Sequence, residues 1–156
     1  MSASSNLALV LIAYRRLESV SRILEQAKKS GVDRVYIVID RSPNNEFVSI
    51  QDEIVNLCEG FRPYFTSMKI VRRKRNAGCA ASVVTAIDWV FRFEKYICIL
   101  EDDCIPTSDF FEFALASKVY LEKEDDLLLA CGTQFVPNNL PRGKWVKSKY
   151  ALTWGW

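Results

Sequence analysis

The stretch Leu7-Ala8-Leu9-Val10-Leu11-Ile12-Ala13 decides the fold prediction, because a continuous apolar run is typical of a strand buried on both faces of a sheet. Apolar side chains at helical spacing follow over Leu17–Ser30, and Gly31 is placed to end that helix. A buried strand followed by an amphipathic helix is the unit from which parallel sheets are built.

The same alternation continues along the chain. Further strands are predicted at Val35–Ile39, Met68–Val71, Tyr96–Leu100 and Leu127–Cys131. Further helices are predicted at Phe47–Cys58, Ala80–Phe93 and Phe110–Leu121. This order predicts an α/β fold of three layers (α/β/α), with a mostly parallel central sheet and right-handed crossovers. We expect a single domain over residues 1–156, truncated from a longer protein, in which residues 136–156 form loop.

Composition excludes several classes of protein. The chain has 156 residues, of which 49% are hydrophobic and 26% charged, a balance typical of a folded domain rather than a disordered one. Lysine and arginine (21) exceed aspartate and glutamate (19) by only two, too little for a protein that coats nucleic acid. Histidine is absent, which excludes histidine bases, catalytic triads and histidine metal sites.

The five cysteines include no C-x-x-C pair, so neither a disulfide framework nor a zinc ribbon is predicted. Cys98 and Cys131 lie in apolar runs and are expected to be buried, in a reducing compartment. Residues 1–6 lack the basic start of a signal peptide, and Leu7–Ala13 is too short to cross a bilayer. We therefore expect no membrane segment and a cytoplasmic or membrane-peripheral location.

Three adjacent carboxylates, Glu101-Asp102-Asp103, directly follow the predicted strand Tyr96–Leu100. Ligands of parallel α/β sheets bind beyond the carboxyl ends of the strands, which is where this acidic turn lies. Adjacent carboxylates repel one another unless they are solvated or a cation offsets the repulsion. Without histidine, the fitting cation is a hard one, Mg²⁺ or Mn²⁺. The alternative is a solvated acidic turn, which is also our interpretation of the second acidic run, residues 122–126.

A basic stretch, residues 69–78, leaves the third predicted strand and leads into a helix that starts near Cys79. The N-terminus of a helix offers free N–H groups and a partial positive charge. Gly78 lets another group approach the backbone closely. Together these features suit a diphosphate, and a solvated basic loop is the alternative. Nucleic-acid binding is less favoured, because the stretch is short and the overall charge is near zero.

Two weaker groups of residues complete the set. Tyr14-Arg15-Arg16 follows the first strand, and its flat side chains could stack on a nucleotide base. Asp40 follows the second strand and could accept an N–H from the edge of a uracil-like base. Near the end of the chain, the aromatic side chains of Trp154-Gly155-Trp156 could pack against sugar faces. Ordinary loop packing is the alternative for each group.

Several well-known motifs are missing from the sequence. It contains no G-x-x-x-x-G-K-[ST] phosphate loop, no G-x-G-x-x-G after the first strand and no G-x-S-x-G nucleophile turn. Aspartyl-phosphate enzymes and receiver domains would carry an acidic residue at the end of the first strand, where this chain has Tyr14-Arg15-Arg16.

Taken in order, these pieces resemble a GT-A nucleotide-sugar glycosyltransferase over nearly the whole chain. Residues 9–16 resemble the first strand and base-binding turn of that family, and Ile37-Val38-Ile39-Asp40 resembles the second strand with its base-reading aspartate. Arg75-Asn76-Ala77-Gly78 is similar to the R-N-x-G turn near the diphosphate. Trp154-Gly155-Trp156 resembles the G-W element of the acceptor region.

The acidic turn carries the most specific part of the resemblance. Together with Asp109-Phe110-Phe111, it resembles the E-D-D-x-x-x-x-x-D-F-F signature of N-acetylglucosaminyltransferase-I-like enzymes and their bacterial relatives. One departure is Arg41, which stands where many family-2-type enzymes carry a second aspartate.

The resemblance implies metal-dependent, inverting transfer of a hexosyl or N-acetylhexosaminyl group from a nucleotide-diphosphate sugar, such as a UDP-sugar, to a hydroxyl of a glycan or another acceptor. The implied donor-binding residues are Ala13, Tyr14, Arg15, Arg16, Asp40, Arg75, Asn76, Gly78, Glu101 and Asp102. Asp103 is implied to bind Mn²⁺ or Mg²⁺, and Trp154, Gly155 and Trp156 to bind the acceptor. The catalytic base is not identified and is expected beyond Trp156, because Asp109 is expected to cap a helix.

Three other functions remain open. The chain could be a nucleotide-sugar-binding module without catalysis, or a structural domain of the same architecture. It could also be a nucleotidyltransferase, although such enzymes carry a glycine-rich stretch directly after the first strand, where residues 14–18 contain no glycine.

Overall fold

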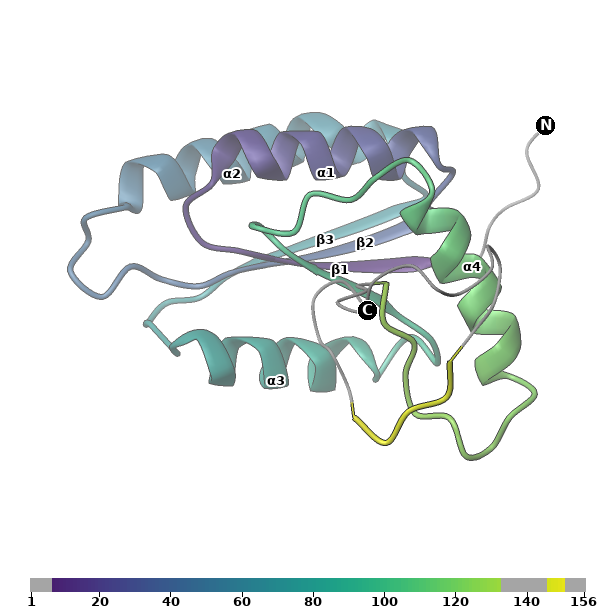
Figure 1. Ribbon diagram of the computed structural model, residues 1–156. Helices are drawn as coiled ribbons and strands as arrows, with labels where there is room; N and C mark the ends of the chain where they lie inside the picture. The colour runs from purple at the N-terminus through teal and green to yellow at the C-terminus, as the bar shows by residue number, and fades with distance from the viewer. Residues whose placement is uncertain (1–6, 133–145, 151–156) are drawn as a thin grey trace.

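The computed structural model describes residues 7–132 and 146–150 (Figure 1). Its strands are β1 (Ala8–Ala13), β2 (Arg34–Ile39), β3 (Ser67–Arg72) and β4 (Cys98–Glu101). Its helices are α1 (Leu17–Lys29), α2 (Val48–Phe61), α3 (Cys79–Val90) and α4 (Phe110–Leu121), with a short 3-10 helix, η1, at Arg62–Tyr64. Each of these strands and α-helices overlaps one that the sequence predicted.

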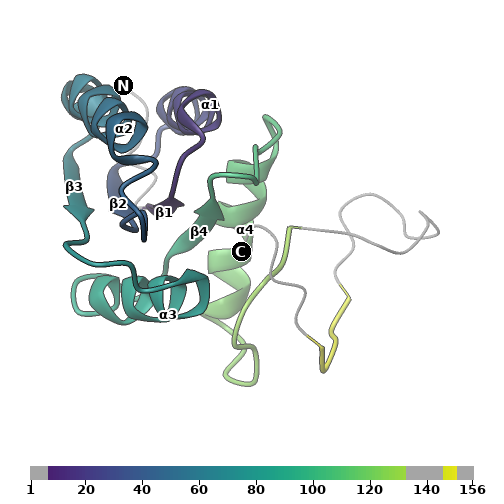
Figure 2. The same cartoon turned by 90° about the vertical axis from the view of Figure 1, so that its left-hand side faces the viewer.

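The four strands form one parallel sheet in the order β3-β2-β1-β4. Helices α1 and α2 lie on one side of this sheet and α3 lies on the other, as Figures 1 and 2 show. The predicted α/β fold, with helices on both faces of a parallel sheet, is therefore confirmed.

Strand β1 shows why a solid apolar run is needed at the centre. Successive side chains of β1 point to opposite faces of the sheet. Because helices cover both faces, every position of the strand needs an apolar residue. One face presents Leu9 and Leu11 to a core that includes Ile23 of α1 and Ile54 of α2. The other face presents Val10 to a second core that includes Val90 of α3. Phe111 of α4 joins the first core, which ties α4 to the α1 and α2 side.

The order of the strands reverses direction beside β1. From β1 the chain proceeds outward to β2 and β3, and then returns to place β4 on the opposite side of β1. Such a reversal is a topological switch point, where ligands of doubly wound sheets bind beyond the carboxyl ends of the strands. The turns after β1 and β4 therefore flank the position at which a ligand is expected.

One predicted strand is wrong. Residues 127–131, Leu127 to Cys131, form no strand, and Leu128 is 94% exposed. A strand needs a partner for its backbone groups, and an apolar sequence does not supply one by itself. Cys131 is accordingly only half-buried, contrary to its prediction, whereas Cys98 in β4 is buried as predicted.

One smaller prediction is confirmed. Residues 122–126 are exposed, in agreement with a solvated acidic turn. Within the described residues, no helix is both long and apolar enough to cross a membrane.

A polar network joins the amino end of β2 to the segment after α3. Arg34 of β2 forms an ion pair with Glu94, with 2.6 Å between Nε and Oε1, and the Tyr36 hydroxyl donates to the same Oε1 at 2.8 Å. Burial, and secondarily the hydrogen bond to Glu94, raises the pKa of Tyr36 to about 12 from 10.0. The protonated phenol is therefore the form that the folded protein stabilises.

We predict that Tyr36→Phe lowers the free energy of unfolding by about 1 kcal/mol at neutral pH, because the hydrogen bond to Glu94 is lost. Since the folded pKa is the higher one, the tyrosine's contribution is complete below pH 10 and is lost as the pH rises towards 12. Urea unfolding from pH 8 upward measures the difference between the two proteins. Tyr64→Phe, at an exposed tyrosine, is the control, and a difference that does not shrink above pH 10 would contradict the assignment.

Candidate functional site

The carboxyl ends of the strands bring together the segments that the sequence singled out. Ala13 of β1 is in register with Ile39 of β2, which is in register with Arg72 of β3. On the other side, Ile12 of β1 pairs with Glu101 of β4. Residues 14–16, 40–42, 73–78 and 101–103 therefore leave the sheet at the same edge. Ala13 itself is buried, and its carbonyl accepts a hydrogen bond from the Asp40 backbone N–H at 3.2 Å.

Asp102 organises the turn that follows β1. Its Oδ2 accepts hydrogen bonds from the backbone N–H groups of Tyr14, Arg15 and Arg16, at 2.8, 3.1 and 3.2 Å. Its Oδ1 accepts from the Arg16 guanidinium at 2.7 Å. These amides directly precede α1, where the helix dipole also favours a negative charge. Asp102 is only 4% exposed, and its two carboxylate oxygens accept from these four donors. Its carboxylate therefore holds this turn in place.

Asp40 has the same role for a different turn. Its Oδ1 accepts from the Ala77 N–H at 2.9 Å, and its Oδ2 accepts from the Gly78 N–H at 3.0 Å. Gly78 has φ +78°, a conformation that favours glycine, and it directly precedes α3. The Asn76 amide donates to the Arg41 carbonyl at 2.6 Å, which further joins the two turns. Asp40 thus fixes the position of the predicted diphosphate-binding turn.

Asp103 differs from its two neighbours in the acidic turn. Its side chain is 54% exposed, and it forms an ion pair with Arg16, whose Nη1 lies 3.4 Å from Oδ2. Burial first, followed by the charges of Asp103 and Asp102, raises the pKa of Glu101 above its ordinary value. The Sγ of Cys79, the first residue of α3, lies 4.0 Å from Oε2 of Glu101. The start of α3 and the acidic turn are therefore adjacent.

The basic stretch divides into two parts. Arg72 pairs with Asp52 of α2, and Arg73 donates to the Ser82 carbonyl of α3 at 3.3 Å. Lys74 and Arg75 are exposed, which leaves them accessible to a ligand. The first N–H groups of any helix lack partners within the helix, so α3 adds donors beside these side chains. The prediction that this stretch suits an anion now applies to the exposed Lys74 and Arg75 rather than to all five basic residues.

Two neighbours of the site were missed by the sequence analysis. Phe47, just before α2, packs edge-to-face against Tyr14, with 5.7 Å between ring centroids, and lies 4.7 Å from the Arg15 guanidinium carbon. Gln51 of α2 is completely buried and contacts the turns after both β1 and β2. The helical pattern over Phe47–Cys58 gave no signal for either role, because only tertiary contacts distinguish these residues from ordinary helix positions.

The residues fit a metal ion only with help from a ligand. Nowhere in residues 7–132 and 146–150 do three or more cysteine, aspartate or glutamate residues form a group that could hold a metal by themselves. Asp103 offers an exposed carboxylate, and Mg²⁺-like ions commonly use one or two carboxylates, with phosphate oxygens and waters as the remaining ligands. The donor set therefore suits a metal that binds together with a diphosphate.

Two further predictions have simple outcomes. Asp109 directly precedes α4, as expected of a capping residue, although its side chain makes no capping hydrogen bond. Trp154, Gly155 and Trp156 lie outside the described residues, so their predicted acceptor role stays a prediction.

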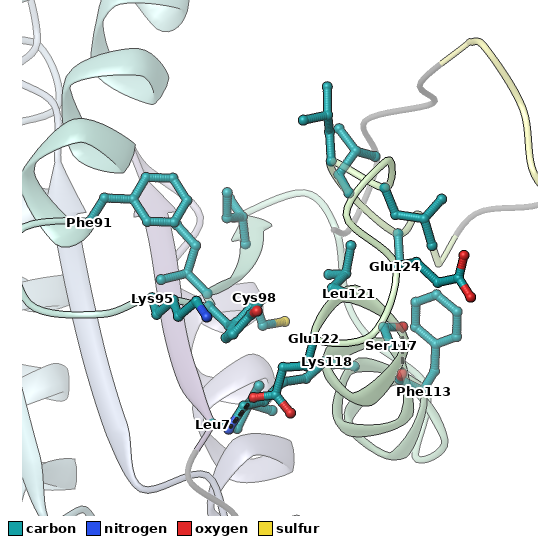
Figure 3. Close-up of a pocket in the computed structure, with 18 of the residues that line it drawn as sticks. Leu7, Phe91, Lys95, Cys98, Phe113, Ser117, Lys118, Leu121, Glu122 and Glu124 are labelled. Carbon is teal, nitrogen blue, oxygen red and sulfur yellow. Dashed lines mark hydrogen bonds and ion pairs between the residues drawn. The ribbon is translucent and has the colours of Figure 1, made fainter.

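A separate cavity of about 360 Å³ lies along β4 (Figure 3). Phe91 and Cys98 line it from one side, and Ser117 and Leu121 of α4 line it from the other. None of the predicted donor-binding residues contributes to its wall. The cavity is therefore distinct from the strand-end site described above.

We predict that Asp102→Asn lowers the free energy of unfolding by about 1–3 kcal/mol, because a neutral amide cannot replace the carboxylate that four donors share. Asp103→Asn is the matched control, and its effect should stay within about 0.5 kcal/mol since the side chain is largely exposed. Chemical denaturation measures both. Equal losses in the two variants would contradict the structural role of Asp102.

Comparison with models of protein families agrees with the observed fold, whereas a comparison with curated proteins found no match. The sequence model of a family described as glycosyl transferase family 2 matches residues 8–149, which include all four strands and the acidic turn. The parallel sheet with flanking helices is consistent with the GT-A fold that the sequence resembles. The chain therefore belongs to glycosyl transferase family 2.

Proposed function

We propose that this chain transfers a sugar from a nucleotide-diphosphate donor, such as a UDP-sugar, to an acceptor hydroxyl with the help of a divalent metal ion. The observation that carries the proposal is the division of roles in the acidic turn. Asp102 is buried and holds the turn after β1, whereas Asp103 is exposed beside it. The contact between Cys79 and Glu101 brings the N-terminus of α3 next to this turn.

These neighbours provide complementary charges for a diphosphate. The N-terminus of α3 carries a partial positive charge, and the exposed Arg75 precedes it in the chain. Asp103 would hold Mn²⁺ or Mg²⁺ through its carboxylate, with phosphate oxygens and waters completing the ligand set. When bound, such an ion acts as a Lewis acid that stabilises the charge on the departing diphosphate.

The chain's own residues would orient the donor. Tyr14 is packed against Phe47 and thereby presents a fixed ring at the end of β1, where a base could stack. Arg16 and Arg75 would offset the negative charge of the donor. An inverting reaction also needs a carboxylate that removes the proton of the acceptor hydroxyl. We assign no residue to that step.

The finer identity of the sugar is part of the proposal. The spacing from Glu101-Asp102-Asp103 to Asp109-Phe110-Phe111 resembles that of N-acetylglucosaminyltransferase-I-like enzymes and supports a hexosyl or N-acetylhexosaminyl group. A thermal-shift panel of UDP-, GDP- and dTDP-sugars, with and without Mn²⁺, would identify the donor. Release of sugar or its transfer to an acceptor would distinguish an enzyme from a binding module.

We predict that Asp103→Ala removes the Mn²⁺-dependent part of UDP binding, at a cost of at least about 100-fold in affinity, since even residues behind a metal ligand cost 10–100-fold. UDP affinity without metal should stay unchanged. Calorimetry with and without Mn²⁺ measures both values. Asp109→Ala, in the same acidic signature but at the start of α4, is the control. Retention of the Mn²⁺ effect in Asp103→Ala would refute the metal assignment.

We also predict that Arg75→Ala weakens UDP binding by about 10–100-fold, the loss of one hydrogen bond to a charged group. Uridine, which has no phosphate, should bind both proteins equally. Lys74→Ala removes an equally exposed neighbouring charge and should have the smaller effect. Equal losses for UDP and uridine would count against a role of Arg75 at the diphosphate.

A further inference from the structure

Gln51 is a polar residue at a position that an apolar side chain would normally occupy. It lies on α2, is 0% exposed, and neighbours the apolar core to which Ile54 of the same helix belongs. Burial of an amide is unfavourable unless its hydrogen-bonding groups find partners. The partners of Gln51 therefore indicate what this residue does.

Both strand-end turns supply those partners. The Gln51 side-chain amide nitrogen donates to the Asp40 carbonyl at 2.7 Å and to the Tyr14 carbonyl at 3.1 Å. Its side-chain oxygen lies 3.4 Å from the Ser42 backbone N–H, which donates to it. Two backbone carbonyls from the turns after β1 and β2 are thus joined through one buried NH₂ group.

This connection begins where the sheet ends. The last backbone hydrogen bond between the β1 and β2 segments runs from the Asp40 N–H to the Ala13 carbonyl. Beyond it, β1 and β2 lead into separate turns that no longer share a ladder. Gln51 replaces the missing ladder bonds and holds the two turns at a fixed separation.

Gln51 also couples two larger arrangements. Asp102 holds the backbone of Tyr14, and Asp40 holds the backbone of Ala77. Since Gln51 binds the carbonyls of both Tyr14 and Asp40, a continuous series of contacts runs from β4 to the start of α3. Movement of one turn relative to the other requires a break in this series.

We propose that Gln51 is a positioning residue for the donor nucleoside, which sets the gap between Tyr14 and Asp40 without touching the ligand. The inference rests on the proposed function, because it takes the turns after β1 and β2 as the walls of the base site. Gln51 acts through the main-chain carbonyls of Tyr14 and Asp40, so its effect falls on the geometry of the base site. Asp103 and Arg75, which are proposed to hold the diphosphate, are not among the hydrogen-bond partners of Gln51, so its effect on the diphosphate is expected to be the smaller one.

The test compares Gln51→Met with Ile54→Val, a mild change at a fully buried residue of the same helix. Hydrogen exchange of the ligand-free protein reports on the two turns, and calorimetry reports on UDP and on Mn²⁺-pyrophosphate. In Gln51→Met we expect faster exchange at residues 14–16 and at residues 41–42 together. We expect UDP affinity to fall about tenfold, which equals about 1.4 kcal/mol, and pyrophosphate affinity to change less than about twofold.

Unchanged exchange at both turns, or equal losses for UDP and pyrophosphate, would overturn the role of Gln51. The same holds if Ile54→Val reproduces the whole effect. Failure of the wild-type protein to bind UDP, GDP or dTDP would instead contradict the proposed function, so the two failures are distinguishable. Should Gln51→Met not fold, Gln51→Asn keeps a shorter amide at the site and carries the same expectations.

Discussion

Two buried carboxylates determine the shape of the candidate site. Asp102, at the end of β4, binds the backbone amides that precede α1, and Asp40, at the end of β2, binds those that precede α3. A buried carboxylate is tolerated only when hydrogen bonds replace its lost hydration, and each amide needs an acceptor for the same reason. Because the carboxylates and the backbone amides satisfy each other's hydrogen-bonding groups, both turns are fixed in the ligand-free protein.

This arrangement separates structural from ligand-binding charge. Asp40 and Asp102 are directed at the protein's own backbone, while the exposed carboxylate of Asp103 stays accessible. A comparable division exists among the basic residues, since Arg72 and Arg73 bind neighbouring elements and Arg75 is exposed. The exposed members of both sets supply the charges that a metal and a diphosphate would need.

The sequence predicts the sheet well because the central strand is apolar at every position. The run from Leu7 to Ala13 has to be covered on both faces, and the helices that follow it carry matching apolar stripes. The error at residues 127–131 has a different cause. An apolar run becomes a strand only where a neighbouring strand provides partners for its backbone hydrogen bonds. The acidic turn was also found from the sequence, but the separate roles of Asp102 and Asp103 depend on partners 86–88 residues away. For the same reason Gln51 could not be distinguished from any other polar residue of α2.

In the proposed mechanism, the carboxylate of Asp103, rather than that of Asp102, binds a divalent ion that holds the donor diphosphate. Anomalous diffraction from crystals grown with Mn²⁺ and UDP tests this directly. We predict a manganese peak bonded to Asp103 and to phosphate oxygens, with the Asp102 contacts to residues 14–16 intact. A peak bonded to Asp102 with those contacts broken, or bound nucleotide without manganese at this edge of the sheet, would contradict it.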